Sequence, residues 1–145
     1  MKLKTFGDYE VRVRESFARQ PTMKTLGVTL EHVAPGEVDL GFAFDTRLTQ
    51  QHGFIHAGIM TTVLDTAAGL AAFSLMPEEA GVLTIELKAS LMRPAKGARF
   101  LCKGRVLKPG RTIVFAEAVG YADDVEIARM SGSMMVVEGR EGVKG

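Results

Sequence analysis

The sequence contains a single cysteine, Cys102, in a chain of 145 residues, so no disulfide can form within it. It also has no excess of either charge, because 18 Lys and Arg against 17 Asp and Glu leave a formal net charge of +1. This balance gives no electrostatic reason to expect nucleic-acid binding. The first residues are charged throughout and contain no secretory apolar core. Together with the unpaired cysteine, this predicts a cytoplasmic protein.

No apolar run of transmembrane length is free of charge. The best candidate, residues 59–76, is rich in Ala, Thr and Gly and is interrupted by Asp65. A central Asp costs about 2.5–3.5 kcal/mol on insertion scales, and the surrounding small residues offset little of this cost. We therefore expect this segment to be a buried helix of a soluble fold, with no membrane as partner.

Several catalytic and binding patterns are also missing. There is no G-x-S-x-G around a serine nucleophile, and no glycine-rich phosphate loop follows a predicted strand. His52 and His56 are four residues apart, but neither has a Cys or a second carboxylate at ligand spacing, and His32 lies far upstream. We therefore predict no bound metal and no cofactor.

The sequence does contain one long apolar segment between stretches of alternating pattern. Apolar periodicity, turn residues and prolines together predict the order of elements in the chain. The expected elements are an N-terminal helical region over residues 1–22, a hairpin over 28–44, a loop over 46–58, a central helix over 59–76, and strands over 82–91, 100–108, 112–121 and 125–137.

The four later strands are separated only by short connections of turn residues. We therefore expect each strand to pair antiparallel with the next along the chain. Five to six antiparallel strands and one helix that is apolar nearly all round predict a sheet wrapped around that helix. This is an α+β fold, in one domain spanning residues 1–145.

Asp65 is the first candidate for chemistry, because it is the one carboxylate in the apolar helix. Burying an unpaired carboxylate is costly, so it needs either a partner or a function. Burial without a neighbouring cation would raise the pKa of Asp65, which suits a general base that works near neutral pH. The alternative is that Asp65 lies on an exposed face or near a helix end.

The junction His56-Ala57-Gly58 before the helix is the second candidate. Free N–H groups in the first turn of a helix are donors for an anion or a developing oxyanion. Small residues there allow a substrate carbonyl to approach the backbone. The alternative is an ordinary loop-to-helix junction in which small residues are only tolerated.

Three stretches carry a family resemblance: QQHGFIHAGIMTTVLDTAAGLAA, GVLTIELKASLMRPAKG and GRVLKPGRTIVFAEAVGY. They resemble the hotdog-fold acyl-CoA thioesterases, in particular the PaaI-like branch of the phenylacetate-pathway type. That family has H-G-G at the helix start and an Asp or Glu nine residues after the His, which is the spacing of His56 and Asp65. The resemblance covers nearly the whole chain after the first helix and implies a hotdog fold.

The resemblance also implies roles for individual residues. Asp65 matches the acid that activates water or attacks the thioester carbonyl. Thr84 matches a Ser or Thr that contributes to the site across the dimer. Gln50 matches an Asn or Gln that positions the water or the thioester, and His56 matches the histidine that shapes the loop and the helix start.

The chain departs from the family pattern at Ala57, which stands where the first Gly of H-G-G is expected, followed by Gly58. The resemblance implies that the backbone N–H at this position polarises the thioester carbonyl. A positive φ would strain an alanine there, whereas ordinary helical dihedrals would accommodate its methyl group, and we expect the latter. Lys108 and Arg111 are candidates to bind the CoA phosphates, with the alternative that they are solvated turn charges.

The resemblance therefore implies a thioesterase that acts on acyl-CoA, as a homodimer or homotetramer with active sites at subunit interfaces. Four large apolar residues are expected to line a tunnel that admits a medium or long chain or an aryl ring: Leu64, Leu70, Phe73 and Met76. Of these acyl groups we expect a medium or long fatty acyl chain, because no aromatic or polar residue is placed to contact a hydroxybenzoyl ring. An aryl or hydroxyphenylacetyl-CoA thioesterase is an alternative. So is a non-catalytic acyl-CoA-binding hotdog protein. A hotdog dehydratase is a further alternative, although no hydratase pair of His and acid marks the helix.

Overall fold

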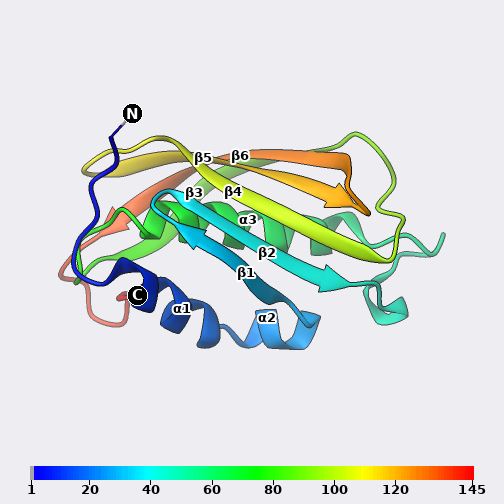
Figure 1. Cartoon of the computed structure of the whole chain (residues 1–145), viewed down its shortest axis with the longest axis horizontal. Coiled ribbons are helices and arrows are strands. Elements are labelled where there is room, and N and C mark those ends of the chain that lie inside the picture. The colour runs from blue at the N-terminus through cyan, green and yellow to red at the C-terminus, as the bar shows by residue number, and fades with distance from the viewer. Residues whose placement is uncertain (1) are drawn as a thin grey trace.

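The computed structural model describes residues 2–145. Six strands form one antiparallel sheet in the order β1-β2-β4-β5-β6-β3, and this sheet runs along α3 (Figure 1). The elements are α1 (Tyr9–Ala18), α2 (Pro21–Leu26), β1 (Thr29–Ala34), β2 (Glu37–Ala43), a short 3-10 helix (Thr46–Leu48), α3 (Ala57–Phe73), β3 (Gly81–Leu91), β4 (Arg99–Lys108), β5 (Ile113–Ala122) and β6 (Val125–Val137).

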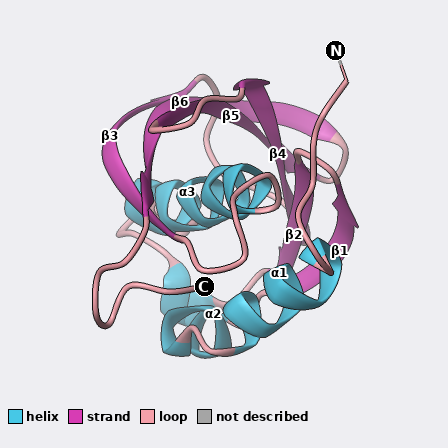
Figure 2. Ribbon diagram, turned by 90° about the vertical axis from the view of Figure 1, so that its left-hand side faces the viewer, coloured by secondary structure: helices cyan, strands magenta, loops and turns pink. Residues whose placement is uncertain are grey.

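The sheet curves around α3, and α1 and α2 lie across the open side of the curve (Figure 2). Because α3 is covered on most sides, its side chains are apolar nearly all round. Ala67, Ala68 and Ala71 of this helix are fully buried. On β4, a Cβ at Gly104 would lie only 2.2 Å from the Ala67 carbonyl oxygen, so the strand and the helix are in direct backbone contact. The predicted α+β hotdog fold is confirmed.

The central helix begins and ends earlier than the sequence pattern predicts. It starts at Ala57 rather than at residue 59, because the His56 side chain caps it one residue before. It ends at Phe73 rather than at residue 76. The Ser74 hydroxyl donates to the Ala71 carbonyl at 2.6 Å and accepts the Gly36 N–H at 2.8 Å, which ties the helix end to the β1–β2 turn.

Pairing of consecutive strands is confirmed for β1–β2, β4–β5 and β5–β6, but the prediction is wrong for β3. β3 pairs with β6, with Gly81 opposite Val137, and β4 pairs with β2. The connection between β3 and β4 crosses the end of the β5–β6 hairpin, where the Met92 N–H donates to the Ile127 carbonyl at 2.8 Å. An alternating pattern fixes which face of a strand is buried, but it does not identify the neighbouring strand.

β3 is consequently an edge strand, and one of its sides pairs with no strand within residues 2–145. Leu83, Ile85 and Leu87 on this strand are 43%, 48% and 36% exposed. A long edge with exposed apolar side chains is a template for pairing with another chain. Among residues 2–145, no helix has both the length and the hydropathy needed to span a bilayer.

Candidate functional site

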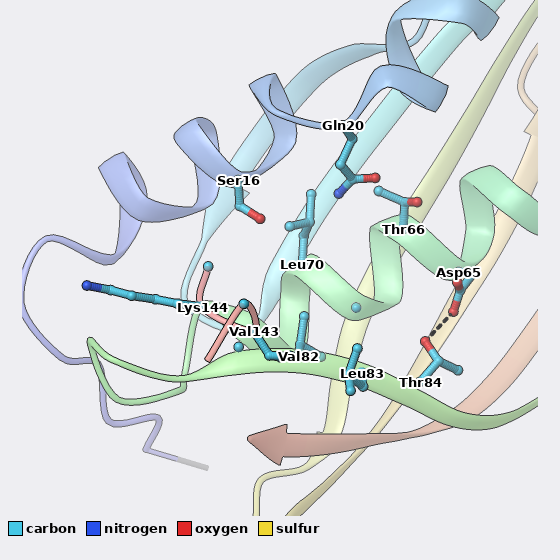
Figure 3. Close-up of a pocket in the computed structure, with 14 residues that line it drawn as sticks. Ser16, Gln20, Asp65, Thr66, Leu70, Val82, Leu83, Thr84, Val143 and Lys144 are labelled. Atoms are coloured by element: carbon cyan, nitrogen blue, oxygen red, sulfur yellow. Dashed lines mark hydrogen bonds between the residues drawn. The ribbon is translucent and has the colours of Figure 1, made fainter. Parts of the chain in front are cut away.

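Asp65 lies in the middle of α3 and faces the beginning of β3. The Thr84 hydroxyl donates a hydrogen bond to Asp65 Oδ1 at 2.9 Å (Figure 3). Burial raises the pKa of Asp65 above its usual value, and the hydrogen bond from Thr84 opposes part of that rise. An acid in this environment is a better proton acceptor than an exposed one, once it is ionised.

The Asp65–Thr84 pair opens into a cavity of about 360 Å³ between α1, α3, β3 and the last residues of the chain. Its apolar lining includes Leu70 and Val82. Three further uncharged polar side chains line it, and no sequence pattern marks them: Ser16, Gln20 and Thr66.

Thr66 differs from the two threonines that precede it on α3. The hydroxyls of Thr61 and Thr62 bond back to the carbonyls of Ala57 and Gly58, at 2.8 and 2.9 Å. The Thr66 hydroxyl makes no such bond to the described residues, so it is available to a molecule in the cavity.

The beginning of α3 is organised by His56. As the N-cap, its Nδ1 accepts the Gly58 N–H at 2.9 Å, so in this arrangement Nδ1 carries no proton. Ala57 has helical dihedrals and is exposed, and no acceptor within residues 2–145 takes its N–H. The methyl group of Ala57 is therefore compatible with the backbone, and its N–H is an open donor at the positive end of a helix.

Gln50 is held in the loop that precedes α3. Its side-chain Oε1 accepts the backbone N–H of His52 at 2.6 Å, and the backbone N–H of Gln50 donates to the Phe54 carbonyl at 2.9 Å. Gln50, His56 and Ala57 line a second cavity, of about 580 Å³. Arg93, from the connection after β3, lines the same cavity and brings a cation that the motif comparison missed.

The candidate residues thus form two groups in one chain. Asp65 and Thr84 line one cavity, Gln50, His56 and Ala57 line the other, and none of the described residues lines both. Ala57 and Asp65 are eight positions apart on α3, which corresponds to about 12 Å along the helix axis. One reacting carbonyl would need to lie about 3 Å from both groups. A single copy of the chain does not meet this requirement.

The remaining predicted residues lie elsewhere. Lys108 ends β4 and Arg111 lies in the β4–β5 turn, both exposed and outside these two cavities. Of the four residues expected to line an apolar tunnel, only Leu70 borders the cavity beside Asp65. The other three are fully or almost fully buried in the core: Leu64, Phe73 and Met76.

A family model described as the thioesterase superfamily matches residues 52–129. The chain belongs to the thioesterase superfamily. This thioesterase is 52% identical to a thioesterase family protein of known structure from Silicibacter pomeroyi. The two superpose over 90% of this chain and 99% of the other, with a TM-score of 0.89.

Two further proteins are similar to this chain. Acyl-coenzyme A thioesterase 13 of Mus musculus is 26% identical, over 78% of this chain and 76% of its own. The E. coli PaaI protein from the phenylacetic acid degradation operon shares the fold, with a TM-score of 0.83 at 14% identity over 90% of this chain and 94% of its own. The resemblance to PaaI-like hotdog thioesterases is confirmed, and the thioesterase is a thioester hydrolase.

Proposed function

We propose that this thioesterase hydrolyses acyl-CoA to a free acid and CoA, with Asp65 as the residue that starts the reaction. The observation that carries the proposal is the partly buried carboxylate of Asp65, hydrogen-bonded to Thr84 and open to a cavity. The acyl-CoA class is supported by the similarity to acyl-coenzyme A thioesterase 13. We place the reaction in the cytoplasm and treat residues 1–145 as one domain.

In this reaction the Asp65 carboxylate removes a proton from a water molecule, whose oxygen attacks the thioester carbon. The carbonyl oxygen becomes an oxyanion, and the N–H of Ala57 stabilises it from the start of α3. The C–S bond then breaks, and the proton passes to the departing CoA thiolate. Gln50 orients the water or the thioester, and His56 keeps the Gly58 N–H occupied so that Ala57 is the open donor.

Asp65 could instead attack the carbonyl itself and form an anhydride that water then hydrolyses. A single turnover in ¹⁸O-labelled water separates the two routes. Water attack places the label in the free acid during the first turnover. Attack by the carboxylate on the carbonyl leaves label in Asp65 when water opens the anhydride at the enzyme's side.

Because Ala57 and Asp65 of one chain are too far apart, we propose that two copies form each site. One copy supplies Asp65 and Thr84, and the other supplies Ala57 and Gln50. The unpaired edge of β3 supports this homodimer, since two β3 strands can pair antiparallel about a two-fold axis. A homotetramer built from two such dimers is compatible with the same sites.

For the acyl group, we infer a medium-length or long fatty chain, supported by Leu70 and Val82 beside Asp65. The second candidate is an aryl or hydroxyphenylacetyl group. Ser16, Gln20 and Thr66 favour it, because they place hydrogen-bonding groups in the cavity. A site that hydrogen-bonds a substrate hydroxyl rejects the analogue lacking it by roughly 10⁴-fold or more. A preference of this size for hydroxyphenylacetyl-CoA over phenylacetyl-CoA would therefore support the second candidate, whereas faster hydrolysis of octanoyl-CoA than of either would support the fatty chain.

The CoA moiety carries phosphates, for which Lys108 and Arg111 are our proposed ligands, together with Arg93 beside Gln50. If Lys108 and Arg111 bind CoA, then replacing both with alanine raises KM for every acyl-CoA and leaves kcat nearly unchanged. An unchanged KM would identify them as solvated turn charges and would leave Arg93→Ala as the next variant to measure.

The decisive experiment measures free thiol released from a panel of acyl-CoAs by the wild type and by Asp65→Asn. We expect turnover by the wild type and a large loss in the variant. Binding of acyl-CoA without thiol release would instead support a non-catalytic acyl-CoA-binding protein. Full activity of Asp65→Asn would show that our mechanism is wrong.

A further inference from the structure

Gly69 occupies an unusual place in α3. It lies in the interior of the helix, one turn after Asp65 and on the same face, where glycine is less favourable than alanine. Its φ is not positive, so the backbone does not require glycine. Gly69 is buried, yet apart from its two chain neighbours and the adjacent helix backbone, no heavy atom of residues 2–145 lies within 4 Å of the position that a Cβ would occupy.

Gly104 is a glycine that close packing requires, and it differs from Gly69 in the space around its Cα. A Cβ at Gly104 would clash with the Ala67 carbonyl oxygen at 2.2 Å, so close contact explains that glycine. No such contact explains Gly69. Because Gly69 has no side chain, the space beside it is empty. This space is part of the cavity that Asp65 and Thr84 line.

The last residues of the chain close the same cavity at the end away from Asp65 (Figure 3). A Cβ at Gly81 would lie 2.8 Å from the Val143 carbonyl oxygen, so the chain end packs directly on the first residue of β3. The Gly145 N–H donates to the Ala80 carbonyl at 3.1 Å, and Lys144 Nζ lies 2.8 Å from Glu79 Oε2. The Arg19 guanidinium also donates to the Gly145 carbonyl.

These features define a pocket with a measurable depth. Thr84 and Gly81 are three residues apart on β3, which is about 10 Å along a strand. An acyl group whose carbonyl lies between Asp65 and Thr84 runs past Gly69 and Leu70 and meets Val143 at the far end. A longer group reaches further only if residues 142–145 leave their position on β3.

We propose that Gly69 sets the width and residues 142–145 set the depth of the acyl pocket, so that together they select the acyl group. This inference rests on the proposed acyl-CoA hydrolysis. It makes Gly69 and Val143 specificity-determining residues that take no part in proton transfer. The width and depth of the pocket limit an aryl group as well as an alkyl chain. The inference therefore holds for either acyl group, including one that hydrogen-bonds to Ser16, Gln20 or Thr66.

The test compares kcat/KM across butanoyl-, octanoyl-, decanoyl- and hexadecanoyl-CoA. Gly69→Leu fills the empty space, and one methylene in an apolar pocket changes kcat/KM about tenfold or more. We therefore expect the decanoyl-to-butanoyl ratio to fall at least about tenfold. A variant that ends at Glu141 opens the far end, and we expect its hexadecanoyl-to-octanoyl ratio to rise about tenfold.

Gly81→Ala is a second way to move residues 142–145, because the three heavy atoms nearest to the added Cβ all belong to Val143. It should raise the same hexadecanoyl-to-octanoyl ratio in the chain of 145 residues and have no further effect in the chain that ends at Glu141. Gly69→Ala should raise Tm, whereas Gly104→Ala should lower it. A lower Tm for Gly69→Ala would show that the space at Gly69 is filled.

Binding of the corresponding alkyl-CoA thioethers separates this inference from the proposed function. If the wild type hydrolyses no acyl-CoA, the proposed function is wrong, and the thioether length profile still tests the pocket. Unchanged length profiles in Gly69→Leu and in the shortened chain would overturn the inference. Equal losses for every chain length in Gly69→Leu would overturn it as well.

Discussion

The two ends of the candidate site on α3 differ in what they offer to a substrate. The beginning of the helix is exposed and offers an unpaired N–H at Ala57, with Gln50 and Arg93 nearby. The middle of the helix is partly buried and offers the carboxylate of Asp65, held by Thr84. One end has a hydrogen-bond donor, and the other has a carboxylate that we propose as the proton acceptor.

Neither end is sufficient for thioester hydrolysis. A donor group without a base polarises a carbonyl but does not activate water, and a base alone leaves the oxyanion without a partner. About 12 Å of helix separates the two groups, which is why we propose that two copies related by symmetry complete each site.

Loss of the base should have the largest effect. We expect Asp65→Asn to lower kcat by roughly 10²–10⁴-fold, the usual contribution of a positioned general base. Asp39→Asn is the matched control, because burial also raises the pKa of Asp39 but this residue lies on β2. Equal losses in both variants, measured by thiol release, would indicate general damage to the fold.

Loss of the donor should have the next largest effect. Ala57→Pro removes only the backbone N–H, since Ala57 is the first residue of α3 and His56 already has extended dihedrals. We expect kcat to fall by about 10²–10³-fold, as for removal of one oxyanion donor, while circular dichroism and Tm stay close to those of the wild type. Retained turnover would place the oxyanion elsewhere.

Mixing the two inactive variants tests whether each site uses two copies. In an exchanged equal mixture of Asp65→Asn and Ala57→Pro, half the dimers are mixed and each has one intact site. We expect about a quarter of wild-type activity, given one two-fold interface. If both groups acted within one chain, no mixed dimer would have an intact site, and the mixture would stay inactive.

Removal of the hydrogen bond to the base should have a smaller effect, visible in the pH profile. The Thr84 hydroxyl lowers the pKa of Asp65, so Thr84→Ala should raise that pKa further. The acid limb of kcat/KM should therefore move to higher pH. Thr84→Ser keeps the hydroxyl and is expected to keep the limb near its wild-type position, whereas equal shifts in both variants would point to packing.

The smallest expected effect is on stability. The pKa of Asp65 is raised in the folded state, so its contribution to stability is complete below the unfolded pKa, about 3.9, and is lost as pH rises through the folded pKa. At neutral pH, Asp65→Asn should therefore melt at the wild-type temperature or above. This advantage should disappear at acid pH, and a variant that is less stable at neutral pH would contradict the raised pKa.

The parts of this molecule that depend on local pattern could be predicted from sequence. The apolar run with Asp65 and the proline at residue 77 were enough for α3, and alternation was enough for the strands. The partner of β3 could not be predicted, because any strand of the same alternation satisfies its buried face. Pairing with β6 depends on how the whole sheet closes around α3.

In the candidate site, too, features set by local sequence could be predicted and features set by the whole fold could not. The spacing of His56, Ala57 and Asp65 reflects one helix, and it is visible in the sequence once the family is considered. Gly69 and Val143 belong to a cavity formed by segments that are far apart in the chain, so no local signal marks them. The tunnel prediction was wrong for Leu64 because a helix that is apolar on every side does not reveal which side faces the sheet.

Gly104 fixes the distance between α3 and β4, because only a hydrogen atom separates its Cα from the Ala67 carbonyl oxygen. Ala67 is two residues after Asp65 in the same rigid helix. The height at which the carboxylate stands above the sheet is therefore set by a glycine on a different strand. Any larger residue at position 104 would push α3 away from β4 and move the Asp65 carboxylate with it.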